Sequence, residues 1–175
     1  MASAIRVGVS SCLLGERVRY DGGQRHDRYI TDILGRIFTF IPVCPEVGCG
    51  LPVPREAMHL EGDPANPRLV TIMTRIDLTG RMQDYCSSKV IALEREGLSG
   101  FIFKSRSPSC AFLPIEVYSS GGSGRSQGLF AAAVTEHFPL LPVEEEGRLN
   151  NPEIREDFME RVLAYSRIQM SHPIT

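Results

Sequence analysis

The chain has 175 residues, of which 42% are hydrophobic and 23% are charged, and its formal net charge is −2. These proportions are typical of a soluble globular protein with one core, and they exclude a fibrous or disordered chain. Without a basic surplus a nucleic-acid partner has no electrostatic support, and no apolar stretch reaches the roughly 20 residues that span a bilayer. The N-terminal MASAIRVGVS also lacks the features of a secretion signal, so we expect a cytoplasmic protein.

The first half of the chain predicts two buried strands separated by a helix. The apolar runs are residues 5–9 (IRVGV) and 38–43 (FTFIPV), and apolar residues recur at helical spacing over residues 29–38. Residues 48–67 are rich in proline and glycine, which is typical of an irregular binding loop. Residues 69–78 (LVTIMTRIDL) are expected to be extended.

The second half predicts a helix over residues 82–97 and a buried strand over residues 100–104. Residues 116–118 are expected to be a short strand, and the short apolar segment 141–143 is expected to be an edge strand. The segment GGSGRSQG (121–128) is expected to be a flexible loop.

Two further helices are predicted towards the C-terminus. Residues 128–138 are alanine-rich, and the glycines before them could present helix N–H groups to an anion. The last helix begins at Asn151 with Pro152 in its first turn, and Ile154, Phe158 and Val162 recur on one face.

The alternation of strands and helices predicts the α/β class, with a Rossmann-like, mainly parallel sheet flanked by helices. We expect one domain over residues 1–175, in which residues 141–175 are a C-terminal extension carrying the amphipathic helix. No G-x-G-x-x-G follows the first strand, so a dinucleotide site has no support.

Three of the five cysteines follow predicted strands: Cys12, Cys44 and Cys110. Because the carboxyl ends of parallel strands meet at one edge of a sheet, their thiols should converge where open α/β folds bind ligands. Any one of them could be a small buried hydrophobe, but three together indicate a metal or iron–sulfur site. Cys86 lies within a predicted helix and is expected to be structural, and Cys49 falls in the irregular loop with no clear assignment. The absence of C-x-x-C removes support for a zinc ribbon or a thioredoxin-like site.

Polar residues stand beside these cysteines. Glu46 follows Cys-Pro at a strand end, where it is either a solvated carboxylate or, beside a metal, a group that activates water or relays a proton. The hydroxyls of Ser107 and Ser109 either close a turn or position a substrate. Further candidates for substrate binding are Ser11 and Lys104. The basic residues Lys104, Arg55 and Arg106 are either solvated or offset the negative charge of a buried cluster.

Three segments of the chain together resemble the thiouracil desulfurase family, a bacterial family long known only as a domain of unknown function. They are V-S-S-C-L-L-G-x-x-V-R-Y-D-G (9–22), C-P-E-x-x-x-G-L-P-x-P-R (44–55) and K-S-R-S-P-S-C (104–110), and the resemblance extends over about residues 5–140. Two residues depart from the family pattern: Ala111 stands where glycine is more usual, and Cys49 adds a thiol within the second segment.

The resemblance implies an oxygen-sensitive [4Fe-4S] cluster held by Cys12, Cys44 and Cys110, with one iron left for the thiocarbonyl sulfur of a thiolated pyrimidine. It implies Glu46 as the acid/base and Ser107 as an aid to substrate or proton handling, in a non-redox conversion of thiouracil to uracil and sulfide. Aerobic handling would remove such a cluster. Alternatives are an iron–sulfur sulfurtransferase acting on another thiolated substrate and a metal- or redox-sensing cysteine module.

Overall fold

The computed structural model describes residues 4–171 and contains two four-stranded sheets. Sheet A has the strand order β2-β1-β5-β8, and all its neighbouring strands are parallel. Its strands are β1 (Arg6–Ser10), β2 (Thr39–Val43), β5 (Leu98–Phe103) and β8 (Val143–Glu145). The predicted α/β class with a parallel sheet flanked by helices is therefore confirmed, and the segment at 141–143 contributes to an edge strand as expected.

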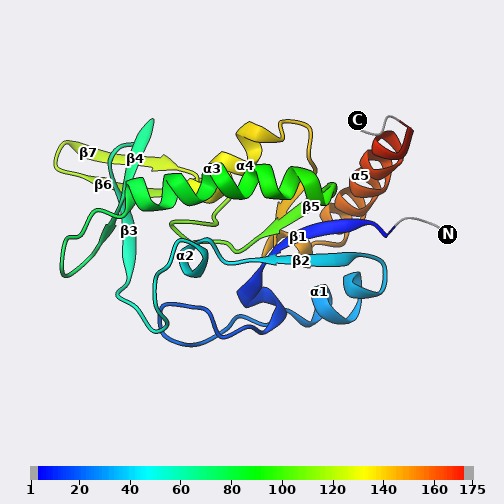
Figure 1. Ribbon diagram of the computed structural model, residues 1–175, viewed down its shortest axis with the longest axis horizontal. Helices are drawn as coiled ribbons and strands as arrows, with labels where there is room; N and C mark the ends of the chain where they lie inside the picture. Colours follow the sequence, from blue (N-terminus) through cyan, green and yellow to red (C-terminus); the bar gives the residue numbers. More distant parts are fainter. Residues whose placement is uncertain (1–3, 172–175) are drawn as a thin grey trace.

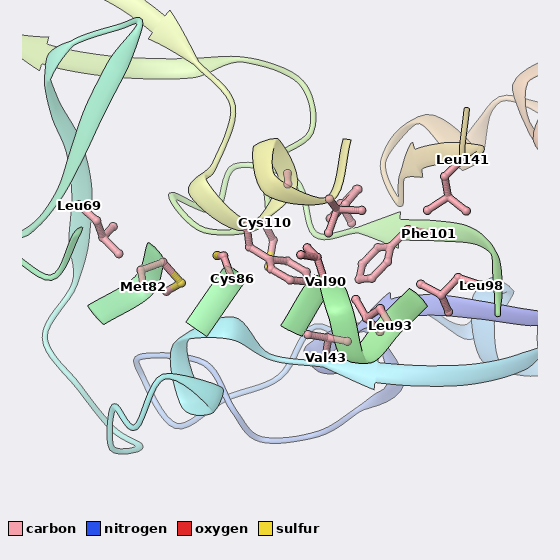
Figure 2. Close-up of a cluster of buried hydrophobic side chains, with 14 of the residues drawn as sticks. Val43, Leu69, Met82, Cys86, Val90, Leu93, Leu98, Phe101, Cys110 and Leu141 are labelled. Atoms are coloured by element: carbon pink, nitrogen blue, oxygen red, sulfur yellow. The ribbon is translucent and has the colours of Figure 1, made fainter. Parts of the chain in front are cut away.

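Helices cover both faces of sheet A because side chains alternate along each strand. Phe101 and Phe103 of β5 pack against α3 (Thr79–Glu96) and α4 (Leu129–His137). Ile102 points to the other face, towards α1 (Arg28–Asp32) and α5 (Pro152–Ser171). Figure 1 shows α3 running along the sheet, and Figure 2 shows Val90 and Leu93 of that helix gathered around Phe101.

Sheet B lies at the end of the molecule away from the termini (Figure 1). Its order is β4-β3-β6-β7, formed by β3 (Met58–Asp63), β4 (Asn66–Thr71), β6 (Ile115–Ser119) and β7 (Gly122–Ser126). Two loop predictions were therefore wrong: residues 58–63 form β3, and residues 122–126 of GGSGRSQG form β7. In both cases an antiparallel partner, β4 for β3 and β6 for β7, supplies the backbone hydrogen bonds that local composition does not encode. The extended segment expected over residues 69–78 is confirmed only as far as Thr71, where β4 ends.

The helices match those predicted from the sequence, except that one of them is divided in two. The helix expected over residues 29–38 is divided into α1 and a 3-10 turn, Leu34–Arg36, because Ile33 takes φ −107°. The helix predicted over residues 82–97 is confirmed as α3, which begins three residues earlier and ends at Gly97 in the left-handed region (φ 65°). The predictions for α4 and α5 are confirmed. Within residues 4–171, none of the helices combines the length and apolar character needed to cross a bilayer.

Gly8 in the central strand β1 leaves room for the ring of Phe101 on the neighbouring strand β5. A Cβ on Gly8 would stand 2.3 Å from a ring carbon of the fully buried Phe101. We expect Gly8→Ala to lower the free energy of unfolding by about 1–3 kcal/mol in urea titrations, because the ring cannot move without opening the core. The matched Gly80→Ala change meets no atom within 4 Å and lies in α3, so it should leave stability unchanged or raise it by up to about 1 kcal/mol. Equal effects of the two changes would contradict this account.

Candidate functional site

Three thiols converge at the carboxyl edge of sheet A. Strand pairing sets Ser10 beside Val43 and Val9 beside Ile102, so β2, β1 and β5 end close together. Their following segments carry Cys12 in a 3-10 turn (Ser11–Leu14), Cys44 at the start of α2 (Pro45–Gly48), and Cys110 in the loop after β5. All three cysteines line one cavity of about 110 Å³.

The same cavity gathers most of the polar residues selected from the sequence. Ser11, Glu46, Lys104 and Ser107 line it beside the cysteines. Ser109 is fully buried and does not line the cavity, but its hydroxyl donates a 2.9 Å hydrogen bond to Glu46 Oε1. The three sequence segments, which are remote from one another in the chain, therefore form one site.

The carboxylate of Glu46 is held from two sides. Arg55 donates through Nε to Glu46 Oε2 at 2.8 Å and also through Nη2, while Ser109 occupies Oε1. The Arg55 side chain is 6% exposed and that of Glu46 is 12% exposed, so this ion pair is largely desolvated. Arg55 also donates to the carbonyl oxygens of Val18 and Pro52, which ties the loop after β1 to the loop after β2.

The third loop is shaped by Ser107 and by helix α4. The Ser107 hydroxyl oxygen accepts hydrogen bonds from the backbone N–H groups of Ser109 (3.2 Å) and Cys110 (3.0 Å), which leaves its own proton available for donation. At Gly128 a Cβ would stand 2.5 Å from the carbonyl carbon of Ser109, so only glycine allows α4 to approach this loop.

The close contact of α4 with this loop contradicts the anion site that was expected before α4. The first N–H groups of the helix, on residues 129–131, donate to the carbonyl oxygens of Pro108 and Ser109. Because these donors are already bonded, they hold the cysteine loop and leave no free amides for an anion.

Lys104 is held at the rim by Glu146. Its ammonium group donates to Glu146 Oε1 at 2.5 Å, and its backbone N–H donates to Ser10 Oγ at 2.9 Å, which links β5 to β1. The next residue but one, Arg106, is exposed and has φ 58°, a left-handed conformation that only a few per cent of non-glycine residues adopt. This strained turn directs the chain from β5 into the Ser107 loop.

Burial keeps the thiols neutral when no metal is bound. Desolvation raises the pKa of Cys12 to about 11, and Lys104 and Arg19 lower it in part. Desolvation also raises the pKa of Cys44, and it raises that of Cys110 strongly against a hydrogen bond from Ser10. Binding of a metal as thiolate would therefore have to displace protons from all three sites.

The remaining cysteines lie outside the cavity. Cys49 packs against the apolar core and its thiol donates to the Glu46 carbonyl oxygen at 3.2 Å, and Cys86 lies on the buried face of α3. Burial raises the pKa of both thiols. Ala111 is buried and has no positive φ, so the glycine that is more usual there is not needed.

Over residues 4–171, no three His, Cys, Asp or Glu side chains come close enough to hold a single metal ion. This finding concerns one-ion sites, whereas the thiolates of a cubane each bind a different corner iron and stand further apart.

Two functional features were missed from the sequence. Arg55 was interpreted as a solvated cation or a charge beside a cluster, yet it forms a buried ion pair with Glu46. Arg19 and Tyr20 line the cavity and were not selected. Both residues belong to the segment V-R-Y-D-G, which follows the turn that carries Cys12. This position in the first family segment could have identified them.

The chain is similar to known proteins in sequence and in fold. The sequence profile of the 2-thiouracil desulfurase family matches residues 7–146. A solved structure of a [4Fe-4S]-dependent thiouracil desulfidase, TudS, superposes with a TM-score of 0.69 at 28% identity and covers 89% of this chain and 98% of that one. None of the curated proteins is significantly similar in sequence.

Removing Arg55 should destabilise the protein, because the buried carboxylate of Glu46 would lose its partner. We expect Arg55→Met to lower the free energy of unfolding by about 2–4 kcal/mol, and a second change, Glu46→Gln, to recover part of that loss. The matched control is Arg161→Met, which breaks an ion pair with Asp157 whose side chains are 41% and 64% exposed. It should cost less than about 1 kcal/mol. Urea titrations of the wild type, Arg55→Met, Glu46→Gln and the double variant would measure the cycle, with Arg161→Met as a fifth protein. Additive losses for Arg55 and Glu46 would contradict the expectation.

Proposed function

Because this chain belongs to the 2-thiouracil desulfurase family, we propose that it converts a thiolated pyrimidine base to its oxo form and sulfide. The cofactor of this proposal is a [4Fe-4S] cluster held by Cys12, Cys44 and Cys110, and the substrate is thiouracil. The observation that carries the proposal is the convergence of these three thiols with Glu46 on one cavity.

The residues of the cavity fit an anionic cluster. Three thiols are the donor set of a cluster that keeps one iron without a protein ligand, and Cys49 is outside the cavity lining, so it does not supply a fourth. Lys104 and Arg19 lower the pKa of Cys12, so both cations favour charge at the site. When bound, the cluster would supply a Lewis acid for the thiocarbonyl sulfur.

Glu46 is the group we assign to proton transfer. Its two oxygens are fixed by Arg55 and Ser109, so the carboxylate keeps one orientation towards the cavity. In the proposed reaction a water oxygen forms a bond to the ring carbon while Glu46 accepts a proton from that water. Glu46 returns this proton to the sulfur as the carbon–sulfur bond breaks, so that sulfur leaves as hydrosulfide. The second water proton passes to solvent as the carbonyl forms. Carbon and sulfur keep their oxidation states, so no reductant is required.

The serines have separate roles in this proposal. Ser107 lines the cavity with its proton free, so it is the hydroxyl assigned to substrate or proton handling. Ser109 donates to Glu46 and is assigned to positioning the carboxylate. Ser11 and Lys104 are assigned to the wall of the substrate site.

The ligand assignment is tested by changing each cysteine to serine in turn. After anaerobic reconstitution, the Cys12, Cys44 and Cys110 variants should lose most of the cluster absorbance and hold well below about four irons per chain. Cys49→Ser and Cys86→Ser are the matched controls and should keep both, because neither thiol lines the cavity. Loss of the cluster in Cys49→Ser with retention in Cys44→Ser would refute the assignment.

The role of Glu46 is tested by sulfide release from 2-thiouracil. We expect Glu46→Ala to lower turnover by about 10²–10⁴-fold with unchanged cluster absorbance, because the variant lacks its general base. Glu116→Ala, an exposed glutamate of β6, should keep wild-type turnover. If Glu46→Ala loses the cluster as well as turnover, Glu46 is a structural residue and the assignment fails.

A further inference from the structure

We propose that Arg19 determines specificity at this site by donating hydrogen bonds to the exocyclic carbonyl oxygen of the pyrimidine. The inference rests on the proposed function, because it concerns the substrate of the same cavity. Arg19 lines that cavity on the segment that follows the Cys12 turn.

Arg19 stands out because its Nε is buried and lacks a hydrogen-bond acceptor within residues 4–171. No other buried side-chain nitrogen or oxygen in that part of the chain lacks a partner. The nearest carboxylate oxygen, Asp21 Oδ1, is 3.8 Å away, too far for a hydrogen bond, and it accepts instead from the Gly23 N–H. A desolvated donor without an acceptor is costly, which marks this guanidinium as incompletely bonded. Because Nε itself is shielded from water, a ligand in the cavity would be bound by the terminal Nη groups of Arg19.

The other cations of the cavity are already satisfied. Arg55 is bonded to Glu46 and to two carbonyl oxygens, and Lys104 is bonded to Glu146 and Ser105. Arg106 is exposed, so water can satisfy its donors. Arg19 is only 19% exposed and lies 5.6 Å from the ring centroid of Tyr20, which also lines the cavity. Among the cations that line the cavity, Arg19 is therefore a partly buried one whose acidic neighbour, Asp21, lies beyond hydrogen-bond distance.

The chemistry of the substrate selects its oxygen as the acceptor. In 2-thiouracil the ring N–H groups are donors and cannot pair with a guanidinium. The thiocarbonyl sulfur is assigned to the open iron by the proposed function. The carbonyl oxygen at position 4 is the acceptor that remains, and a guanidinium can offer it two N–H groups.

The test compares ligands with and without this oxygen. Arg19→Met removes the donors, and the matched control Arg17→Met changes an exposed arginine of the same segment, which donates to the Gly22 carbonyl oxygen and does not line the cavity. Each holoprotein is titrated anaerobically by calorimetry with uracil and with pyrimidin-2-one, which lacks the 4-oxo group. Turnover is measured with 2-thiouracil and with pyrimidine-2-thione. The two analogues also lack one ring N–H. Because each ligand is measured with both the variant and the wild type, the contribution of that N–H to binding cancels when the two proteins are compared.

We expect Arg19→Met to weaken uracil binding and kcat/KM for 2-thiouracil by about 10- to 100-fold, and to change the analogues by less than about 3-fold. Cluster absorbance should be unchanged, and Arg17→Met should match the wild type. Equal losses for both ligands, no loss for either, or loss of the cluster in Arg19→Met would overturn the inference. If the wild type releases no sulfide, the proposed function fails by itself, and the uracil and pyrimidin-2-one affinities still decide the role of Arg19.

Discussion

The parallel pairing of β2, β1 and β5 is the constraint on which the site depends. Hydrogen bonds between these strands fix which residues stand side by side, and the three strands end at the same edge of sheet A. β1 connects to β2 on one side and pairs with β5 on the other, so the cavity lies at the point where the strand order reverses. Open α/β sheets bind ligands at such points because the loops diverge and leave a crevice. The cysteines need only follow their strands closely to meet there.

The loops themselves are held by polar contacts whose acceptors and donors are mostly buried. Arg55 connects the loop after β2 to the loop after β1, and Ser109 connects the third loop to Glu46. Helix α4 adds a backbone contribution, since its first N–H groups bond the carbonyl oxygens of the third loop. These contacts fix the orientation of Glu46 before any ligand arrives, which reduces the rearrangement needed for proton transfer.

Desolvation and nearby cations act in opposite directions on the thiols of the cavity. Desolvation raises the pKa of all three thiols, so they are neutral without a metal, whereas Lys104 and Arg19 act against that rise at Cys12. Glu146 partners Lys104, and Glu46 partners Arg55. Arg19 has only the longer 3.8 Å ion pair with Asp21, so it is held less closely than the other two cations.

The sequence by itself determined the α/β class, the positions of most strands and helices, and the cysteines and several of the polar residues that line the cavity. Apolar runs and helical spacing depend on local composition, and the family segments mark Cys12, Cys44, Glu46 and Cys110 directly. Strands β3 and β7 of sheet B were not predictable. β3 lies in a stretch rich in proline and glycine, β7 is itself rich in glycine, and both become strands only beside their partners. The tertiary structure also decided which polar groups are partnered. The Arg55–Glu46 ion pair and the unbonded Nε of Arg19 depend on burial and distance across loops, and these are properties of the packed chain that local sequence does not encode.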